Sequence, residues 1–407
     1  MGKISFSSGF FLFTCAVGVS VSMLYVYMMG PFIIALQAEL GWTRSQVVSG
    51  LLPVSILSVI AAPLVGMGVD RFGSRPFALG GLILFCGAIA ALSLATSVYY
   101  WFAVWLLLAV GSIQIKPTVW LTAIAKRFTK GRGLAMGLGL SGTGLTAATV
   151  PLIATWLIDS FGWRMAFVGL GLGALAIVLP LALVFFRETD RGVAAAPKPA
   201  PPRGEIAAMM KSGLFVAMAA SGFFISFAIM ALVVHFVPIL VSFSISPVEA
   251  AALASSIGIF STLGRIVTGL LLDRFPAHLV GVTAFVLPAI ACAILLGSAG
   301  EAQILLFVAG ALIGFSLGAE VDVLAFLAAR YFGVANYGTI FGTMMGVMSL
   351  ALGVGPSATA MMFDLLGSYT AVLVVLATAS LVGMVLIFST RKLATRIAPV
   401  ADGGGLH

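Results

Sequence analysis

Apolar residues occur along the chain in long runs separated by short polar stretches. Each run is about 20 residues or longer, which is the length an α-helix needs to cross a bilayer core of about 30 Å. The pattern predicts twelve transmembrane helices, with approximate bounds 10–37, 45–68, 77–97, 101–124, 133–158, 163–186, 212–241, 249–272, 279–299, 303–328, 338–362 and 369–389. We therefore expect an all-α membrane protein, since a helix satisfies its own backbone hydrogen bonds in lipid.

One long polar segment divides these runs into six and six. It contains the sequence Ala194-Ala-Ala-Pro-Lys-Pro-Ala-Pro-Pro-Arg203, whose proline content is typical of a linker. We expect an N-terminal six-helix bundle at residues 1–190, a cytoplasmic linker at 191–211 and a C-terminal six-helix bundle at 212–407. The first apolar run is longer than a signal-peptide core, so we interpret it as a retained helix.

The two halves share a motif. Gly66-Met-Gly-Val-Asp70-Arg71-Phe72-Gly73 follows the second run, and Gly269-Leu-Leu-Leu-Asp273-Arg274-Phe275-Pro276 follows the eighth, with 203 residues between the two aspartates. A membrane chain that repeats itself at half its length predicts two pseudo-symmetric bundles, an arrangement typical of transporters.

Composition excludes a water-soluble protein. Hydrophobic residues make up 61% of the chain and charged residues 8%, whereas a soluble domain has about 25% charged residues; the mean hydropathy is +1.19. With a cytoplasmic N-terminus, the outer loops contain only two cations, Arg44 and Arg164. The positive-inside rule then predicts a multi-pass membrane protein with both termini in the cytoplasm. The net charge of +8 is thus explained by the cations of the cytoplasmic loops, which set the orientation in the membrane. We therefore expect no nucleic-acid partner.

The first motif, extended to Arg75, resembles the signature loop between helices two and three of the major facilitator superfamily. Asp273 and Arg274 occupy the equivalent loop of the second half, where Pro276 and His278 replace the later glycine and arginine. In that family these loops hold the two bundles together in the outward-facing state. The resemblance implies a conformational latch made of Gly66, Asp70, Arg71, Gly73, Arg75, Asp273 and Arg274. The alternative is that both loops are tight turns that keep positive charge inside.

A second resemblance concerns the subfamily. Phe128-Thr-Lys130-Gly-Arg132-Gly-Leu134-Ala135-Met-Gly137 is similar to the fifth-helix signature of the monocarboxylate porters and their bacterial oxalate/formate antiporter relatives. Gly41-Trp42-Thr43-Arg44-Ser45 and Arg330-Tyr331-Phe332-Gly333 are typical of the bacterial relatives. Ser261 stands where the animal porters have an aspartate one turn before an arginine, and the glycine- and tryptophan-rich entry to their first helix is absent. The animal-type proton mechanism is therefore not transferred to this chain.

Ionisable residues within predicted helices usually face a cavity or a partner. Five occur here: Lys116, His235, Arg265, Glu320 and Asp322. At 1.5 Å per residue, three of them (Lys116, Arg265 and Glu320) lie about 12–15 Å from the inner helix ends, near the bilayer centre. An offset of 204 residues aligns Lys116 with Glu320. Helices 1, 4, 7 and 10 line the cavity of the superfamily, so the resemblance implies that this cation and this carboxylate face each other across it.

The chemistry of these groups suggests their roles. The guanidinium of Arg265 suits a carboxylate bidentately and stays charged when desolvated, so we predict that it anchors the substrate; the alternative is a structural pair with Asp322 or Glu320. Lys116 either contacts substrate or pairs with Glu320. Because two residues correspond to about 200° around a helix, Glu320 and Asp322 point in different directions. Gly314, Gly318 and Asp322 form a small-residue stripe, so we place Asp322 toward a neighbouring helix and Glu320 toward the cavity as the better proton carrier.

Three further residues are weaker candidates. His235, in the outer half of the seventh helix, could relay protons or belong to a gate, and it could equally be a hydrogen-bonded packing residue. Tyr27 on the first helix and Gln114 on the fourth could contact a ligand, although each such residue is more often a packing residue.

These features together predict secondary transport of a small organic anion, a monocarboxylate moved with a proton by alternating access. The alternatives are carboxylate or dicarboxylate exchange and, less well supported, drug efflux. No nucleotide-binding loop is present, so the energy must come from gradients. We expect no enzymatic activity, no cofactor and no metal, because no catalytic or metal-ligand constellation occurs in the sequence. One chain supplies both halves of the pathway, so a functional monomer is expected.

Overall fold

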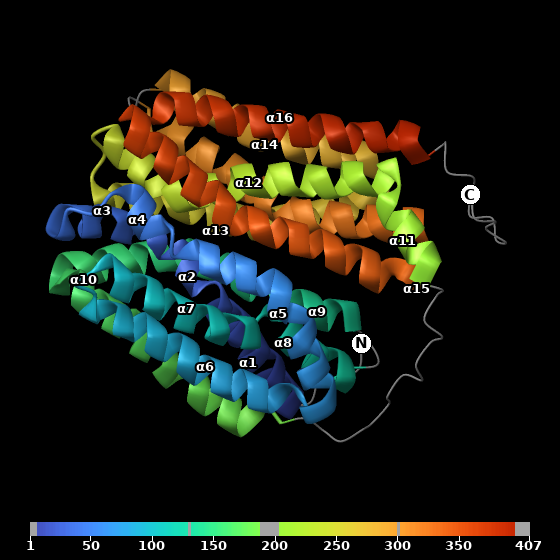
Figure 1. Cartoon of the computed structure of the whole chain (residues 1–407), viewed down its shortest axis with the longest axis horizontal. Coiled ribbons are helices and arrows are strands. Elements are labelled where there is room, and N and C mark those ends of the chain that lie inside the picture. The colour runs from blue at the N-terminus through green and yellow to red at the C-terminus, as the bar shows by residue number, and fades with distance from the viewer. Residues whose placement is uncertain (1–5, 129–131, 188–202, 299–301, 395–407) are drawn as a thin grey trace.

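The computed structural model describes residues 6–128, 132–187, 203–298 and 302–394. These residues form a helical protein whose first-half and second-half helices gather in two bundles lying side by side (Figure 1). The N-terminal bundle contains α1 (Phe6–Ser22), α2 (Leu24–Tyr27), α3 (Met29–Leu40), α4 (Arg44–Val48), α5 (Leu51–Phe72), α6 (Ser74–Ala91), the 3₁₀ helix η1 (Leu92–Leu94), α7 (Val98–Gln114), α8 (Pro117–Arg127), α9 (Arg132–Leu140) and α10 (Gly142–Phe185).

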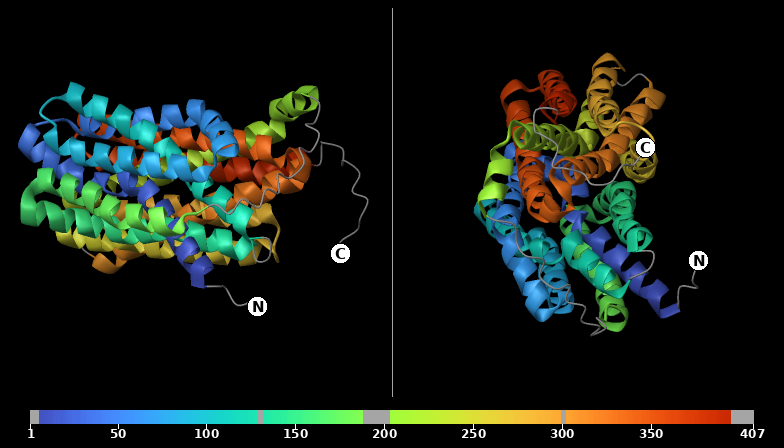
Figure 2. Two further views of the ribbon diagram at one scale, coloured as in Figure 1. Left: turned by 90° about the horizontal axis from the view of Figure 1, so that it is seen from below. Right: turned by 90° about the vertical axis from the view of Figure 1, so that its right-hand side faces the viewer.

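The second half begins with a short helix and continues as the C-terminal bundle. Its helices are α11 (Arg203–Lys211), α12 (Gly213–Ser242), α13 (Pro247–Leu272), α14 (Ala277–Ser298), α15 (Gln303–Leu366) and α16 (Tyr369–Ala394). Helix α11 lies within the predicted linker, most of which falls outside the described residues. The views along and across the bundles in Figure 2 show the long helices running roughly parallel to one another.

The helix pattern agrees with the predicted twelve crossings. Among the described residues, 10 helices are long and apolar enough to cross a membrane. One of these, Ala135–Phe185, covers the fifth and sixth predicted crossings and bends at Gly162, where φ is 76°. The first predicted crossing consists of α1, α2 and α3 in succession. Helix α15 bends in the same way at Gly333, where φ is 74°, a backbone conformation that favours glycine.

Small residues let the two bundles meet closely along two seams. Between α10 and α13, a Cβ on Gly258 would overlap the backbone of Ala148. Between α5 and α15, a Cβ on Gly353 would lie 2.9 Å from the carbonyl oxygen of Leu51. Without side chains at these points the helix backbones approach each other, which is how membrane helices gain packing energy where lipid supplies no hydrophobic drive.

The same seams open toward one end of the molecule. We call this the inner end; it holds the turns at Gly73 and Gly333 and the end of α16, and the opposite, outer end holds α4, Gly162 and Gly367. Along α15, a Cβ on Gly346 would lie 3.9 Å from the Val59 side chain of α5, and a Cβ on Gly342 would meet nothing within 4 Å. Gly137 and Gly269, on the inner parts of α9 and α13, also face open space. The bundles are therefore in contact from the middle outward and separate toward the inner end.

Substitution at the α10–α13 seam is expected to destabilise this arrangement. Gly258→Ala places a methyl group against the backbone of α10, which cannot move away as a flexible side chain could, and overpacking of this kind costs about 1–3 kcal/mol. We expect a lower thermal midpoint for the purified variant in detergent. Gly269→Ala is the matched control, because it makes the same change on the same helix where a Cβ meets nothing within 4 Å. Equal midpoints for the two variants would contradict the close contact.

Candidate functional site

Arg265 and Asp322 form an ion pair in the middle of the C-terminal bundle. Helices α13 and α15 pack closely because a Cβ on Gly318 would overlap the backbone of α13 at Ser261. One turn further along α15, Asp322 faces α13, and its Oδ2 lies 4.0 Å from Nε of Arg265. The side chains of Arg265 and Asp322 are 27% and 30% exposed, respectively. The pair is thus loose and open on one side, so another carboxylate can still reach the guanidinium.

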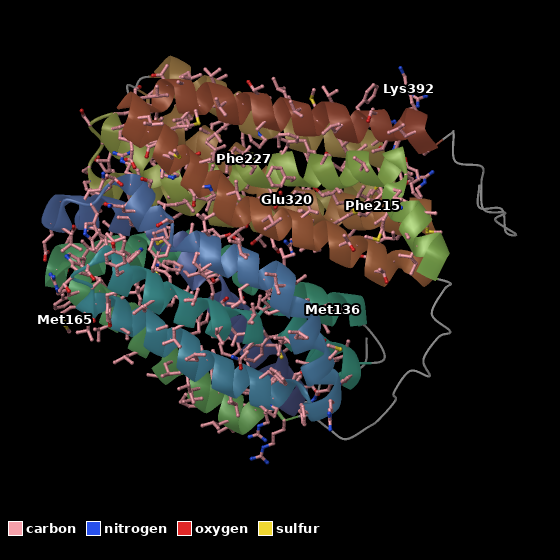
Figure 3. The ribbon with its side chains drawn as sticks, viewed as in Figure 1. Met136, Met165, Phe215, Phe227, Glu320 and Lys392 are labelled. Atoms are coloured by element: carbon pink, nitrogen blue, oxygen red, sulfur yellow. The ribbon has the colours of Figure 1, made fainter. Side chains whose placement is uncertain are left out.

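Glu320 lies on the other side of α15 and is only 4% exposed. Its Oε2 accepts a hydrogen bond of 3.0 Å from the hydroxyl group of Ser226 on α12. Figure 3 places it midway along the C-terminal bundle. The side chain is buried with one neutral donor, and a charge in this environment is costly unless a cation or proton compensates it.

The predicted orientations of these two carboxylates are half correct. Asp322 does contact the neighbouring helix α13, because it continues the glycine stripe. Our expectation that Glu320 has the open position was wrong: Asp322 is the partly exposed carboxylate and Glu320 is enclosed between α12 and α15. The physical reason is that a helix position 200° away from the α13 face points into the next helix–helix contact rather than into open space.

Lys116 lies at a break in the fourth crossing. Helix α7 ends at Gln114 and α8 begins at Pro117, while Lys116 itself has φ −52° and ψ 153°. Proline disfavours the helical conformation of the residue before it, so the Lys-Pro pair produces the break. The indole Nε1 of Trp120 donates to the carbonyl oxygen of Ile115 at 3.0 Å and thereby satisfies one acceptor that the break exposes.

Lys116 is partly exposed, and its amine has no hydrogen-bond or ion-pair partner within the described residues. The ion pair with Glu320 that symmetry suggested is not formed in the part of the chain that the structure describes. We call Lys116, Arg265, Glu320 and Asp322 the central layer. Among the described residues, Arg265 has a carboxylate partner and Lys116 has none.

Of the two polar candidates, the structure brings only one toward the ionisable residues. Tyr27 ends the short helix α2, is partly exposed, and lies within electrostatic range of Arg265 and Glu320. Gln114 instead packs against Gly81 of α6, and its amide donates to the carbonyl oxygen of Val110 at 3.0 Å. We therefore remove Gln114 from the candidate site, because its amide is engaged on its own helix and its stem faces α6.

The outer end is closed by a hydrogen-bonded cluster that joins the two bundles. The carboxylate of Asp364 accepts bonds from the backbone N–H groups of Arg44, at 3.1 Å, and Ser45, at 2.8 Å. The Ser45 hydroxyl donates to the same carboxylate at 2.5 Å. The guanidinium of Arg44 lies 3.5 Å from the centroid of the Phe363 ring and donates to the hydroxyl group of Tyr369. We refer to Arg44, Ser45, Asp364 and Tyr369 as the outer cluster.

His235 continues the outer cluster into the C-terminal bundle. It is fully buried, its Nδ1 lies 3.0 Å from the Tyr369 hydroxyl oxygen, and its Nε2 lies 3.0 Å from the carbonyl oxygen of Pro356. A carbonyl only accepts, so Nε2 carries the proton and Nδ1 accepts from Tyr369 in the neutral ring. His235 thus lies at the outer closure rather than beside Arg265 or Lys116.

The predicted latch residues are at the inner end. Arg75 donates to the carbonyl oxygen of Leu183 on α10 at 2.9 Å, and Arg71 stacks on the neighbouring Phe72 ring at 5.1 Å. Asp273 and Arg274 are exposed and form no ion pair with another described residue. A Cβ on Gly66 would meet nothing within 4 Å, and Gly73 makes the turn with φ 85°. The side chain of Asp70 lies outside the described residues, so its place in the latch stays a prediction.

Sequence reasoning did not find Asp364 and Tyr369 as functional candidates. Both lie in or next to a short outer turn, and neither belongs to a recognisable motif. One available signal was Arg44, because it is one of only two cations in the predicted outer loops. The other, Arg164, forms an ion pair with Glu39 within the N-terminal bundle, and this hydrogen-bonded contact lowers the pKa of the Glu39 carboxyl group.

Comparison with known proteins gives the family. The family model of the Major Facilitator Superfamily matches residues 15–319 and again 218–403. The chain belongs to this superfamily. Monocarboxylate transporter 13 of Bos taurus is 27% identical over 311 residues, covering 75% of this chain and 71% of its own length. The rat protein of the same name is 25% identical over 331 residues, with 76% and 74% covered.

Solved structures agree in fold. A D-xylose-proton symporter superposes with a TM-score of 0.74 at 16% identity, covering 95% of this chain and 97% of its own. A bacterial homologue of the human lysosomal transporter Spinster, in an inward-facing and occupied conformation, gives 0.71 at 17% identity, covering 95% and 96%. This member of the major facilitator superfamily is a transporter.

Loss of the Asp364 carboxylate is expected to loosen the outer closure. Asp364→Asn keeps the shape but removes the charge that three donors share, and hydrogen bonds to charged groups contribute about 1.5–3 kcal/mol each. We expect amide hydrogen exchange of residues 43–52 in the purified protein to accelerate by roughly tenfold or more. Asp159→Asn, at an exposed position near the same end, is the control. Unchanged exchange in Asp364→Asn would show that the cluster does not hold the bundles together.

Proposed function

We propose that this transporter moves a small monocarboxylate together with a proton across the inner membrane of a bacterium. Both termini are cytoplasmic and the monomer is the functional unit. Substrate access alternates between the two sides, and Arg265 and Lys116 bind the carboxylate. The observation that supports the proposal is the charge balance of the central layer: two cations, a partly exposed carboxylate and an enclosed one.

The charge balance of the central layer links protonation of Glu320 to binding of the anion. With both carboxylates ionised, Arg265 and Lys116 are matched by Asp322 and Glu320. A proton on Glu320 removes the cost of keeping a charge at a position that is 4% exposed and has one hydroxyl donor. The layer then carries one excess positive charge, centred on Lys116, which has no carboxylate partner among the described residues. A monocarboxylate restores neutrality. Anion and proton therefore bind together, because either one alone would leave an uncompensated charge in the layer.

The shape of the molecule supports alternating access. The bundles meet from the middle outward through Gly258 and Gly353 and are joined by the outer cluster, whereas they separate toward the inner end. With both termini in the cytoplasm, as proposed, this arrangement corresponds to an inward-facing state. The family's latch loops operate in the opposite state, which agrees with Asp273 and Arg274 having no ion-pair partner among the described residues.

A substrate survey in proteoliposomes tests the proposal. We expect uptake of short aliphatic or aromatic monocarboxylates when the outside is acidified, and little uptake of neutral sugars or cationic drugs. Counter-flow against dicarboxylates such as oxalate inside the vesicles tests the alternative function, anion exchange. Uptake that requires a loaded dicarboxylate and ignores the pH gradient would replace symport by exchange, and extrusion of hydrophobic cations would replace both by drug efflux.

A further inference from the structure

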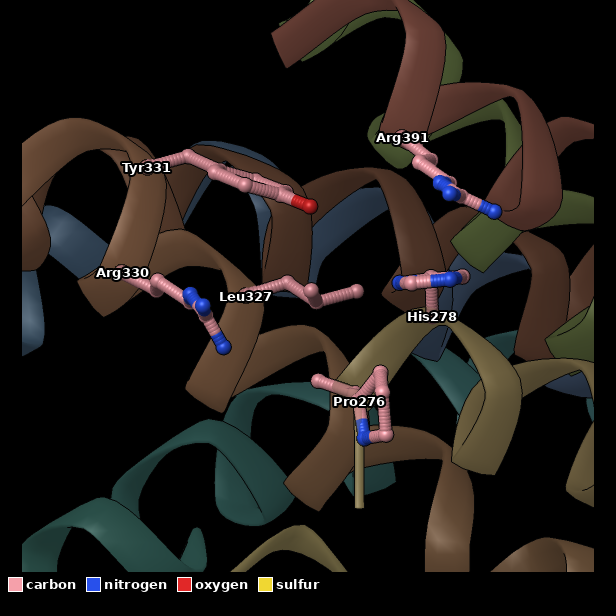
Figure 4. A pocket seen from close by; sticks show the side chains of 7 residues that line it. Pro276, His278, Leu327, Arg330, Tyr331 and Arg391 are labelled. Carbon is pink, nitrogen blue, oxygen red and sulfur yellow. The ribbon is translucent and has the colours of Figure 1, made fainter. Parts of the chain in front are cut away.

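A separate basic hollow lies at the inner end of the C-terminal bundle, away from the central layer. It has a volume of about 190 Å³ and is lined by Pro276, Ala277, His278, Leu327, Arg330, Tyr331 and Arg391. Figure 4 shows Arg330 and Tyr331 entering it from α15, Arg391 from α16 and His278 from α14. Nothing in the transport proposal uses this site.

The hollow is positively charged and contains no carboxylate among its lining residues. The guanidinium groups of Arg330 and Arg391 have no hydrogen bond or ion pair with any described residue. His278 lies within electrostatic range of both of them, and the nearest acidic residue along the chain, Asp273, does not line the hollow. Like charges that converge without a counter-charge repel one another, and an anion relieves that repulsion.

The backbone favours an anion at the same place. Ala277 and His278 form the first turn of α14, where N–H groups have no acceptor within the helix and the helix dipole is positive. Two arginine forks and a tyrosine hydroxyl add side-chain donors suited to phosphate oxygens. The volume corresponds to about six water molecules at about 30 Å³ each, enough for a phosphate group with some of its hydration.

We propose that this hollow binds a phosphate group at the inner membrane surface. Two sources share this chemistry, the headgroup of an anionic phospholipid and a soluble phosphate or phosphate ester. The position makes a lipid headgroup one of these sources, since Arg391 lies in the last turn of a membrane-length helix and basic residues there attract anionic lipid by electrostatics.

Lipid retention and thermal stability together test the proposal. Detergent-purified protein is incubated with phosphatidylglycerol or phosphatidylcholine, and the retained lipid is counted by native mass spectrometry. In parallel, the thermal midpoint is measured in phosphatidylcholine nanodiscs with inorganic phosphate or with chloride at equal ionic strength. The variants are Arg330→Gln/Arg391→Gln, the charge-preserving Arg330→Lys/Arg391→Lys, and Lys392→Gln as a control with the same charge change one position along α16.

We expect the wild type and Lys392→Gln to retain phosphatidylglycerol or to be stabilised by phosphate. In the double glutamine variant, the apparent affinity for phosphatidylglycerol or phosphate should fall about fivefold for each arginine replaced. The double lysine variant should have an affinity between those of the wild type and the double glutamine variant. Selective lipid retention identifies the headgroup as the source, and stabilisation by inorganic phosphate alone identifies a soluble phosphate. Both arginines are exposed, and a normal elution profile confirms folding. Equal lipid retention by the wild type and the double glutamine variant, with no response to phosphate, would overturn the proposal.

Discussion

Arg265→Lys is expected to reduce uptake of a monocarboxylate by about 10- to 100-fold, which corresponds to the loss of one or two charge-assisted hydrogen bonds. Lysine keeps the positive charge but lacks the planar fork, and it leaves Asp322 with a counter-charge, so folding should be preserved. The measurement is the initial rate of uptake into proteoliposomes over a range of substrate concentrations. Because the anchor acts in binding, we expect the apparent KM to rise.

The control for this variant is Arg187→Lys, the same replacement at an exposed position beyond α10. It should transport like the wild type. If Arg265→Lys also transports normally, Arg265 serves only to neutralise Asp322, and the carboxylate of the substrate must then bind to Lys116 without it.

Glu320→Gln is expected to abolish the response of uptake to a pH gradient while leaving substrate exchange within about twofold of the wild type. The amide mimics the protonated carboxyl group in shape and charge, and its oxygen can still accept the hydrogen bond from Ser226, so the buried contact survives. The variant should therefore bind substrate as the protonated form does but be unable to release or accept the proton. Gradient-driven uptake and counter-flow are measured side by side on the same vesicles.

Glu249→Gln provides the matched control, since Glu249 is an exposed carboxylate at the outer start of α13 and should retain full coupling. A Glu320→Gln protein that still accumulates substrate along a pH gradient would transfer the carrier role to another group, and Asp322 is then the next candidate. A lower thermal midpoint with both activities lost would instead indicate damage to the α12–α15 contact.

Much of the fold was predictable because a bilayer imposes a simple rule on sequence. Runs of about 20 apolar residues must be helices, and the predicted crossings agree with the 10 membrane-length helices of the described residues, including the two crossings joined at Gly162 and the two joined at Gly333. The local breaks were harder to see. Met23 and Met28 carry no helix-breaking signal, although the first crossing is divided there. The break before Pro117 does have a local signal, because proline disfavours the helical conformation of Lys116.

For the candidate site, the sequence indicated which charged residues to consider but not how they are oriented. Intramembrane charge identified Lys116, Arg265, Glu320 and Asp322, since each is expensive to bury without a use. Which carboxylate is enclosed depends on how α15 is rotated relative to both α12 and α13. The glycine stripe along α15 predicts the contact with α13 but not the contact with α12. The outer cluster depends on contacts between residues more than 300 positions apart, such as Ser45 and Asp364, which no local pattern in a single sequence reveals.

The central claim is that a proton on Glu320 and a carboxylate on the two cations enter together. Its most direct test is simultaneous recording of substrate uptake and internal pH in proteoliposomes containing the wild-type protein, with the membrane potential clamped at zero and at −100 mV. The account predicts one proton taken up for each monocarboxylate, in either direction of the gradient, and the same rate at both potentials. Substrate uptake without internal acidification, or uptake that appears only with a counter-anion inside, would contradict it.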